Sequence, residues 1–136
     1  MKKIISFVFL VLVLLMVVSC TDDEFLLKNK WQLREYRYSD GTTKKVDSVF
    51  YNFQKGSFMA ICIDENVVNH FFYGNYFLGK SELSIELLEE SVSVNDYYYN
   101  KFFGWPDAKR SFQVEEISPS AMRLKYEGAV SVFRKY

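Results

Sequence analysis

Residues able to do acid–base, nucleophilic or metal chemistry are few and scattered in this chain of 136 residues. His70 is its one histidine, and it stands between Asn69 and Phe71 without the companion ligands that a metal site needs. Adjacent carboxylates such as Glu115-Glu116 cannot readily share one proton site in a strand, because neighbours there point to opposite faces. We therefore expect no enzymatic activity, no metal and no cofactor.

One cysteine predicts covalent attachment of a lipid. Lys2 and Lys3 precede an apolar run from Ile4 to Val18, and Ser19-Cys20 follow it. The run is shorter than the roughly 20 residues of a membrane span and fits the core of a secretory signal. The Val-Val-Ser-Cys ending resembles a bacterial lipobox, whose cysteine takes a diacylglycerol and becomes the first mature residue. The alternative is an ordinary cleaved signal in which Cys20 has no such role.

The expected mature chain has the size of one domain and nearly balanced charge. Removal of residues 1–19 leaves 117 residues, and the loss of Lys2 and Lys3 leaves 15 basic against 17 acidic residues. That balance argues against a nucleic-acid partner, which would need a basic face. Cys62 then has no partner for an intrachain disulfide, and its apolar neighbours predict a small buried side chain.

Alternating apolar residues predict an all-β fold. Strands are expected over residues 31–38, 49–53, 57–63, 67–78, 83–87, 112–117, 121–126 and 129–135. In the first of these, a one-residue bulge would turn Trp31, Leu33, Tyr36 and Tyr38 to the same side. Residues 95–107 break the pattern and are expected to form a short helix, ending at Gly104, or an ordered loop.

Short links between eight strands favour an antiparallel up-and-down barrel, which leaves no open edges. A sandwich of two sheets is the alternative. We expect a signal peptide over residues 1–19, a lipidated acidic tether over 20–29 and one barrel domain over 30–136.

Two sets of aromatic residues could bind a ligand or partner. The first points into the expected barrel and includes Tyr36, Tyr51 and Phe72, together with the aliphatic Val132. An eight-stranded barrel is either filled by such side chains or holds one small ligand. The second set, within the segment from residue 97 to 105, would either plug one barrel mouth or form an exposed patch. It comprises Tyr97, Tyr98, Tyr99, Phe102, Phe103 and Trp105.

The order of several short motifs resembles the lipocalin-like domain lipoproteins of Bacteroidetes, a family of unknown function. The motifs are Lys30-Trp31-Gln32-Leu33, Phe50-Tyr51-Asn52-Phe53, Phe103-Gly104-Trp105 and Val132-Phe133-Arg134-Lys135. The resemblance implies a barrel in which Trp31 stacks against Arg134 and closes one end through a cation–π contact. Asp22-Asp23-Glu24 likewise resembles the surface-export signal of such lipoproteins, although a solvated tether would have the same composition.

Together these features predict a monomeric lipoprotein of the bacterial outer membrane, held through Cys20 and exposed on the cell surface. The alternative location is the periplasmic face. We expect a non-catalytic barrel that binds a small apolar or amphipathic ligand at its mouth. The alternative is a filled barrel that serves as a structural or protein-interaction module.

Overall fold

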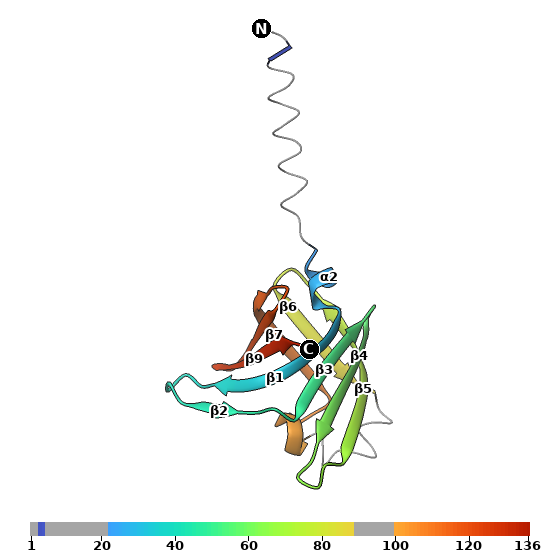
Figure 1. Cartoon of the computed structure of the whole chain (residues 1–136), viewed down its shortest axis with the longest axis vertical. Coiled ribbons are helices and arrows are strands. Elements are labelled where there is room, and N and C mark those ends of the chain that lie inside the picture. Colours follow the sequence, from blue (N-terminus) through green and yellow to red (C-terminus); the bar gives the residue numbers. More distant parts are fainter. Residues whose placement is uncertain (1–2, 5–21, 89–99) are drawn as a thin grey trace.

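The computed structural model describes residues 3–4, 22–88 and 100–136. These residues form one continuous antiparallel sheet with a short helix, α2, in front of it, and residues 100–103 are also helical (Figure 1). The elements are α2 (Asp23–Leu27), β1 (Asn29–Arg37), β2 (Thr43–Lys45), β3 (Val49–Gln54), β4 (Ser57–Ile63), β5 (Asn69–Leu78), β6 (Glu82–Leu87), β7 (Lys109–Ile117), β8 (Ala121–Tyr126) and β9 (Ala129–Lys135).

The sheet closes into a barrel because its first and last long strands pair. β1 and β3 to β9 follow one another around the ring, and β9 pairs with β1 from Trp31↔Lys135 to Arg37↔Val130. The predicted barrel is confirmed and the sandwich is wrong. Eight of the strands were expected, while β2 was not, because its Thr-Lys-Lys sequence is exposed throughout and has no apolar alternation.

The predicted bulge in β1 is present and sets the direction of Tyr36. The register against β9 shifts between Leu33 and Glu35, so that Tyr36 lies opposite Ser131. Leu33 is fully buried and Tyr36 packs partly buried against the core. Without the extra residue, alternation would place Glu35 inside instead.

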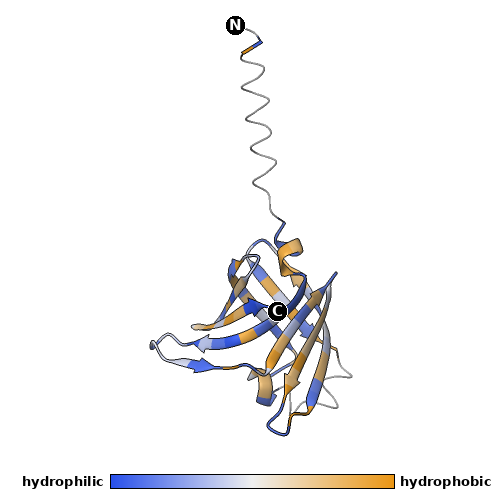
Figure 2. Cartoon of the chain, viewed as in Figure 1, coloured by the Kyte–Doolittle hydropathy of each residue, from blue (hydrophilic) through white to orange (hydrophobic). Residues whose placement is uncertain are grey.

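The barrel is tightly filled over most of its length. Inward side chains with almost no exposure come from all eight strands of the ring, and Figure 2 shows apolar residues concentrated on β3 to β5. They include Trp31, Leu33, Phe53, Phe58, Phe72, Leu83, Ile85, Met122, Leu124 and Phe133. The inward placement of Val132 was wrong: Ser131 and Phe133 are the buried residues of β9, and Val132 between them faces outward.

Helix α2 closes one end of the barrel. The Asp22 carboxylate accepts a hydrogen bond from the Glu24 amide at 3.1 Å and caps the helix. Leu27 is fully buried, and its carbonyl accepts the indole N–H of Trp31 at 2.8 Å. The Tyr76 hydroxyl donates to the Glu24 carboxylate. The segment from Asp23 onward, which lies within the tether expected over residues 20–29, is therefore packed on the barrel.

The cation above Trp31 is Lys135, and the expected stacking of Arg134 there was wrong. The Lys135 ammonium lies 4.4 Å from the indole centroid and donates to the Leu26 and Lys28 carbonyls. Arg134 instead donates to the Gln32 side chain at 2.9 Å. The reason is strand alternation: Trp31 pairs with Lys135 on the inner face, whereas Gln32 pairs with Arg134 on the outer face.

Gly74 allows β5 and β6 to approach each other closely, which yields a stability prediction. A Cβ at this position would overlap the Glu86 carbonyl oxygen and lie 3.1 Å from the Leu87 Cα. Backbone cannot move as a flexible side chain does, so Gly74→Ala should lower the free energy of unfolding by about 1–3 kcal/mol. At Gly79 the nearest atom would be 3.5 Å away, an ordinary contact, so Gly79→Ala is the control. Urea unfolding of both variants checks this, and equal stabilities would contradict it.

Candidate functional site

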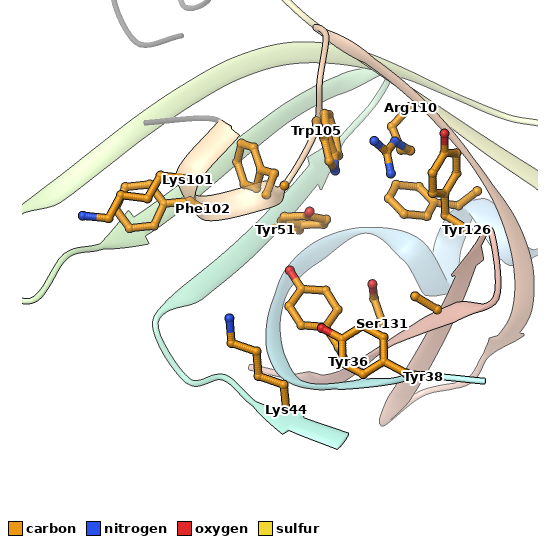
Figure 3. Close-up of a pocket in the computed structure, with 14 residues that line it drawn as sticks. Tyr36, Tyr38, Lys44, Tyr51, Lys101, Phe102, Trp105, Arg110, Tyr126 and Ser131 are labelled. Carbon is orange, nitrogen blue, oxygen red and sulfur yellow. The ribbon is translucent and has the colours of Figure 1, made fainter. Parts of the chain in front are cut away.

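A cavity of about 300 Å³ lies at the end of the barrel opposite α2, beside the helix at residues 100–103 (Figures 1 and 3). Its walls combine aromatic rings, hydroxyl groups and cationic side chains. The described residues lining it are Tyr36, Tyr38, Lys44, Tyr51, Lys101, Phe102, Phe103, Gly104, Trp105, Arg110, Phe112, Tyr126, Ala129 and Ser131. We refer to it as the mouth cavity.

The walls of the mouth cavity come from strands on both sides of the β1–β9 pairing that closes the barrel. The bulge in β1 directs Tyr36 inward, and Tyr51 comes from β3. Arg110 and Phe112 alternate inward on β7, and Ser131 does so on β9. In Figure 3 the Tyr36, Tyr51 and Ser131 oxygens and the Arg110 guanidinium all lie around one space.

Residues 100–105 fold back over the mouth. Gly104 adopts a φ of 66°, which favours glycine, and its amide donates to the Asn100 carbonyl at 2.8 Å. The Asn100 amide side chain donates to the Trp105 carbonyl at 2.9 Å. This turn directs Phe103 and Trp105 into the barrel, where they are almost fully buried. The predicted end of the helical segment at Gly104 is confirmed.

Aromatic contacts show that the mouth is partly plugged and partly open. The Phe103 ring lies 5.0 Å from that of Phe72, 5.9 Å from Tyr51 and 5.1 Å from Trp105, measured between centroids. Phe103 and Trp105 thus act as the predicted plug. Phe102 is only partly buried, and it borders the space that the plug leaves open.

The structure brings together five of the residues predicted from sequence, all of which line the mouth cavity: Tyr36, Tyr51, Phe102, Phe103 and Trp105. Phe72 lies beneath the plug, fully buried, and does not line the cavity. Tyr97, Tyr98, Tyr99 and Cys20 lie outside the described residues.

Sequence reasoning missed the cations of the mouth cavity, which are Lys44, Lys101 and Arg110. Strand alternation could have identified Arg110, because it lies two residues before Phe112 and therefore shares a strand face with it. That signal was lost because the strand was expected to begin only at residue 112.

The Arg110 side chain is held by ring faces. Its guanidinium carbon lies 3.6 Å from the Tyr126 centroid and 5.6 Å from that of Trp105. Such stacking is favourable for arginine because its planar, weakly hydrated cation matches the negative face of a ring. No carboxylate of the described residues lies within 4 Å of it.

Burial keeps Tyr36 and Tyr51 in their neutral, donating form. Loss of hydration raises the pKa of Tyr36 from 10.0 to about 12, although the charge of Arg110 opposes the shift. The same two effects act on Tyr51, whose pKa lies well above its ordinary value. Burial also raises the pKa of the Cys62 thiol, which is fully buried.

His70 has a structural partner. Its Nε2 lies 2.8 Å from Asp64 Oδ2 in the turn between β4 and β5, and its ring lies 5.5 Å from that of Phe102. Hydrogen bonds from His70 and from the Val68 amide lower the pKa of the Asp64 carboxyl. The described residues contain no group of three or more side chains suited to holding a metal ion. Among them no helix is both long enough and apolar enough to cross a membrane.

Two other hollows lie on the outside of the barrel, along β5, β6 and the turn between them. Their volumes are about 350 and 480 Å³, and both are bordered by the exposed Phe77 and by Ser84. They are larger than the mouth cavity, but their walls are mostly exposed outer-face side chains. The hollow of 350 Å³ also touches the inward-facing Tyr76, Ile85 and Arg110. Inward-facing residues of β1, β3, β7, β8 and β9 together make up much of the wall of the mouth cavity, so it is the candidate site.

Comparison with known proteins places these observations in a family. The model of the lipocalin-like domain matches residues 14–136. The chain is 57% identical to a lipocalin-like protein from Bacteroides uniformis of known crystal structure, with a TM-score of 0.76 over 82% of this chain and 99% of that one. It is 46% identical to an uncharacterized protein from Bacteroides eggerthii, with a TM-score of 0.71 over 81% and 99%. Among curated proteins no significant match is found.

The raised pKa of Tyr36 predicts a loss of stability in alkali. Unfolded tyrosines ionise near their ordinary pKa of 10.0, whereas folded Tyr36 keeps its proton to about 12. The free energy of unfolding therefore keeps its full value below pH 10 and falls as the pH rises through 12. Tyr36→Phe should remove roughly 2 kcal/mol of that fall. Urea unfolding across this pH range measures it, and an unchanged slope in the variant would contradict it.

Proposed function

The chain belongs to the lipocalin-like domain family, and on that premise we propose that its barrel binds a small amphipathic ligand, without catalysis, in the mouth cavity. The observation that carries this proposal is the composition of the cavity wall. Rings of Phe102, Trp105 and Phe112 supply apolar surface, and the Tyr36, Tyr51 and Ser131 hydroxyls interrupt it (Figure 3). Ligand sites combine largely apolar walls with a few placed polar groups in this way.

The cavity volume limits the size of the ligand. About 300 Å³ is at the lower end of the range of small-molecule pockets, which reaches roughly 1,000 Å³. The remainder of the barrel is filled by buried side chains such as Phe53, Phe72 and Phe133. A long-chain lipid therefore has no room inside, whereas a molecule of roughly ten non-hydrogen atoms does, at about 30 Å³ for each water-sized group.

Membrane attachment through Cys20 is the second part of the proposal. Only two residues separate Cys20 from Asp23, where α2 begins, and a chain of three residues spans at most about 11 Å. A lipid on Cys20 would hold the α2 end of the barrel close to the bilayer. The mouth cavity lies at the opposite end, so it would open away from the membrane (Figure 1).

The outer membrane is the location we propose, with the cell surface as the exposed side and the periplasmic face as the alternative. Two of the acids in Asp22-Asp23-Glu24 have partners in the fold, because Asp22 caps α2 and Glu24 accepts from Tyr76. Their presence is thus accounted for in part without an export signal. Protease treatment of intact cells distinguishes the two sides.

A protein-interaction role is a second candidate, and one observation favours it. The outer face of β5 exposes Phe71 by 42% and Phe77 by 73%. Phe71→Ser combined with Phe77→Ser tests this role: the double variant should release a bound partner seen on native gels of solubilised membranes while its melting temperature stays unchanged. Identical native-gel migration of wild type and variant as single chains would exclude it.

Ligand binding is tested by filling the mouth cavity. Four small amphiphiles, indoleacetate, indoleacetamide, phenylbutyrate and phenylbutyramide, are titrated calorimetrically into the full chain in phosphatidylcholine nanodiscs. At least one should bind saturably, and empty nanodiscs are the blank. Ala129→Phe places a ring into the cavity and should abolish that binding, because Ala129 lines it. Val132→Phe adds the same ring to the outer face of β9 and should bind as wild type does.

Absence of saturable binding for all four probes would contradict the ligand-binding proposal. Binding that Ala129→Phe leaves unchanged, in a variant with native stability, would place the ligand elsewhere.

Lipid attachment is tested in the producing cells. Metabolic labelling with palmitate should mark the wild-type chain, and Cys20→Ala should remove the label because the acylated thiol is lost. Cys62→Ala is the control, since its thiol is buried in the barrel. A wild-type chain that stays unlabelled, or a Cys20→Ala chain that keeps its label, would contradict attachment at this residue.

A further inference from the structure

We infer that the mouth cavity selects a small amphipathic carboxylate, with Arg110 binding the carboxylate and the aromatic wall binding the apolar body. This inference rests on the proposed ligand binding and specifies the charge and chemical class of the ligand.

The charge of the cavity wall is the first argument. The whole chain has equal numbers of basic and acidic residues, 17 of each. The described residues that line the cavity nevertheless include Lys44, Lys101 and Arg110 and no aspartate or glutamate. A concave site with one sign of charge raises the local concentration of ligands of the opposite sign.

Arg110 differs from the other four arginines of the chain. Each of those has a side-chain oxygen within 3.2 Å: Gln32 for Arg34 and Arg134, Glu35 for Arg37 and Glu116 for Arg123. The Arg110 side chain has neither a hydrogen bond nor an ion pair to any described residue, although it is partly buried. Taking a cation out of water without an anion costs free energy, so a bound anion would stabilise Arg110.

The stacking of Arg110 leaves its binding edge available. Tyr126 and Trp105 contact the guanidinium through their ring systems, with Tyr126 only 3.6 Å from its carbon. The N–H groups lie in the plane of the guanidinium and not on its faces, so stacking does not consume them. Two parallel N–H donors match the two oxygens of a carboxylate.

Tyrosine hydroxyls supply further donors on the same side. Tyr51 is only 4% exposed, its hydroxyl makes no hydrogen bond to a described residue, and it points into the cavity (Figure 3). Arg110 lies near enough to both Tyr36 and Tyr51 for its charge to act on their ionisation. Both hydroxyls stay protonated at neutral pH and can donate to an anion bound by Arg110.

The walls and the volume select the rest of the ligand. Phe102, Trp105 and Phe112 offer apolar ring surface around a space of about 300 Å³. A flat aromatic or short-chain body fits this space, and a carboxylate at one end would reach Arg110. Arylalkyl carboxylates such as indoleacetate and phenylbutyrate have this form.

The experiment compares each acid with its amide, which has nearly the same shape but no charge. With the full chain in phosphatidylcholine nanodiscs, indoleacetate should bind about tenfold or more tightly than indoleacetamide, and phenylbutyrate likewise against phenylbutyramide. Arg110→Met should weaken binding of the acids about tenfold and change binding of the amides less than about twofold. Tyr51→Phe, which keeps the ring, should weaken the acids by a smaller factor.

Lys109→Met is the matched control for charge. Lys109 precedes Arg110 on β7 but is exposed on the outer face, where it lies 3.5 Å from Glu86. Its removal changes the net charge by the same amount and should leave the acid-to-amide preference intact. Melting temperatures establish that each variant is folded.

The outcomes separate this inference from the function on which it rests. Equal binding of acids and amides by the wild type, or a preference that survives in folded Arg110→Met, overturns carboxylate selection while ligand binding stands. A preference for inorganic phosphate or an aryl phosphate over the carboxylates also overturns it. No saturable binding of any probe removes the proposed function itself.

Discussion

Pairing of β1 with β9 is the constraint on which the rest of this structure depends. The ladder joins the two ends of the domain, from Trp31 opposite Lys135 to Arg37 opposite Val130. It turns an open sheet into a ring with an inside, and only a ring gives inward residues a common core. The shift between Leu33 and Glu35 within this ladder also decides what lines the mouth, because it turns Tyr36 rather than Glu35 toward the interior.

The two ends of the ring differ because different side chains meet there. At one end, Leu27 and Trp31 are fully buried and α2 covers the opening. At the other, Phe103 and Trp105 fill part of the opening, and tyrosines and cations surround what remains. The barrel is therefore neither the filled structure nor the hollow one that the sequence left as alternatives. Its core is solid through most of its length, with a small polar-rimmed space at one end.

The parts of the fold that follow from alternation were predictable, and those that depend on a few residues were not. Buried apolar residues at period two located eight strands, and the change of face between Leu33 and Tyr36 predicted the bulge. Strand β2 was not predicted, because its exposed Thr-Lys-Lys sequence has no alternation of apolar and polar residues. Arg134 was placed on Trp31 through a family resemblance, whereas the register puts Lys135 there. Arg110 was missed because a cation inside a barrel contradicts the hydrophobic pattern used to find strands.

The exposed edge of strand β2 affects how copies of this chain can associate. It stands at the end of the strand order, pairing with β1 alone among the described strands, so its other edge presents unpaired backbone groups. Such an edge can recruit a strand from a second molecule, and short length and lysines discourage this. With only three residues, two of them Lys44 and Lys45, β2 is poorly suited to edge-to-edge association. If copies are anchored on one membrane surface as proposed, they would meet side by side, and this edge would not favour their pairing.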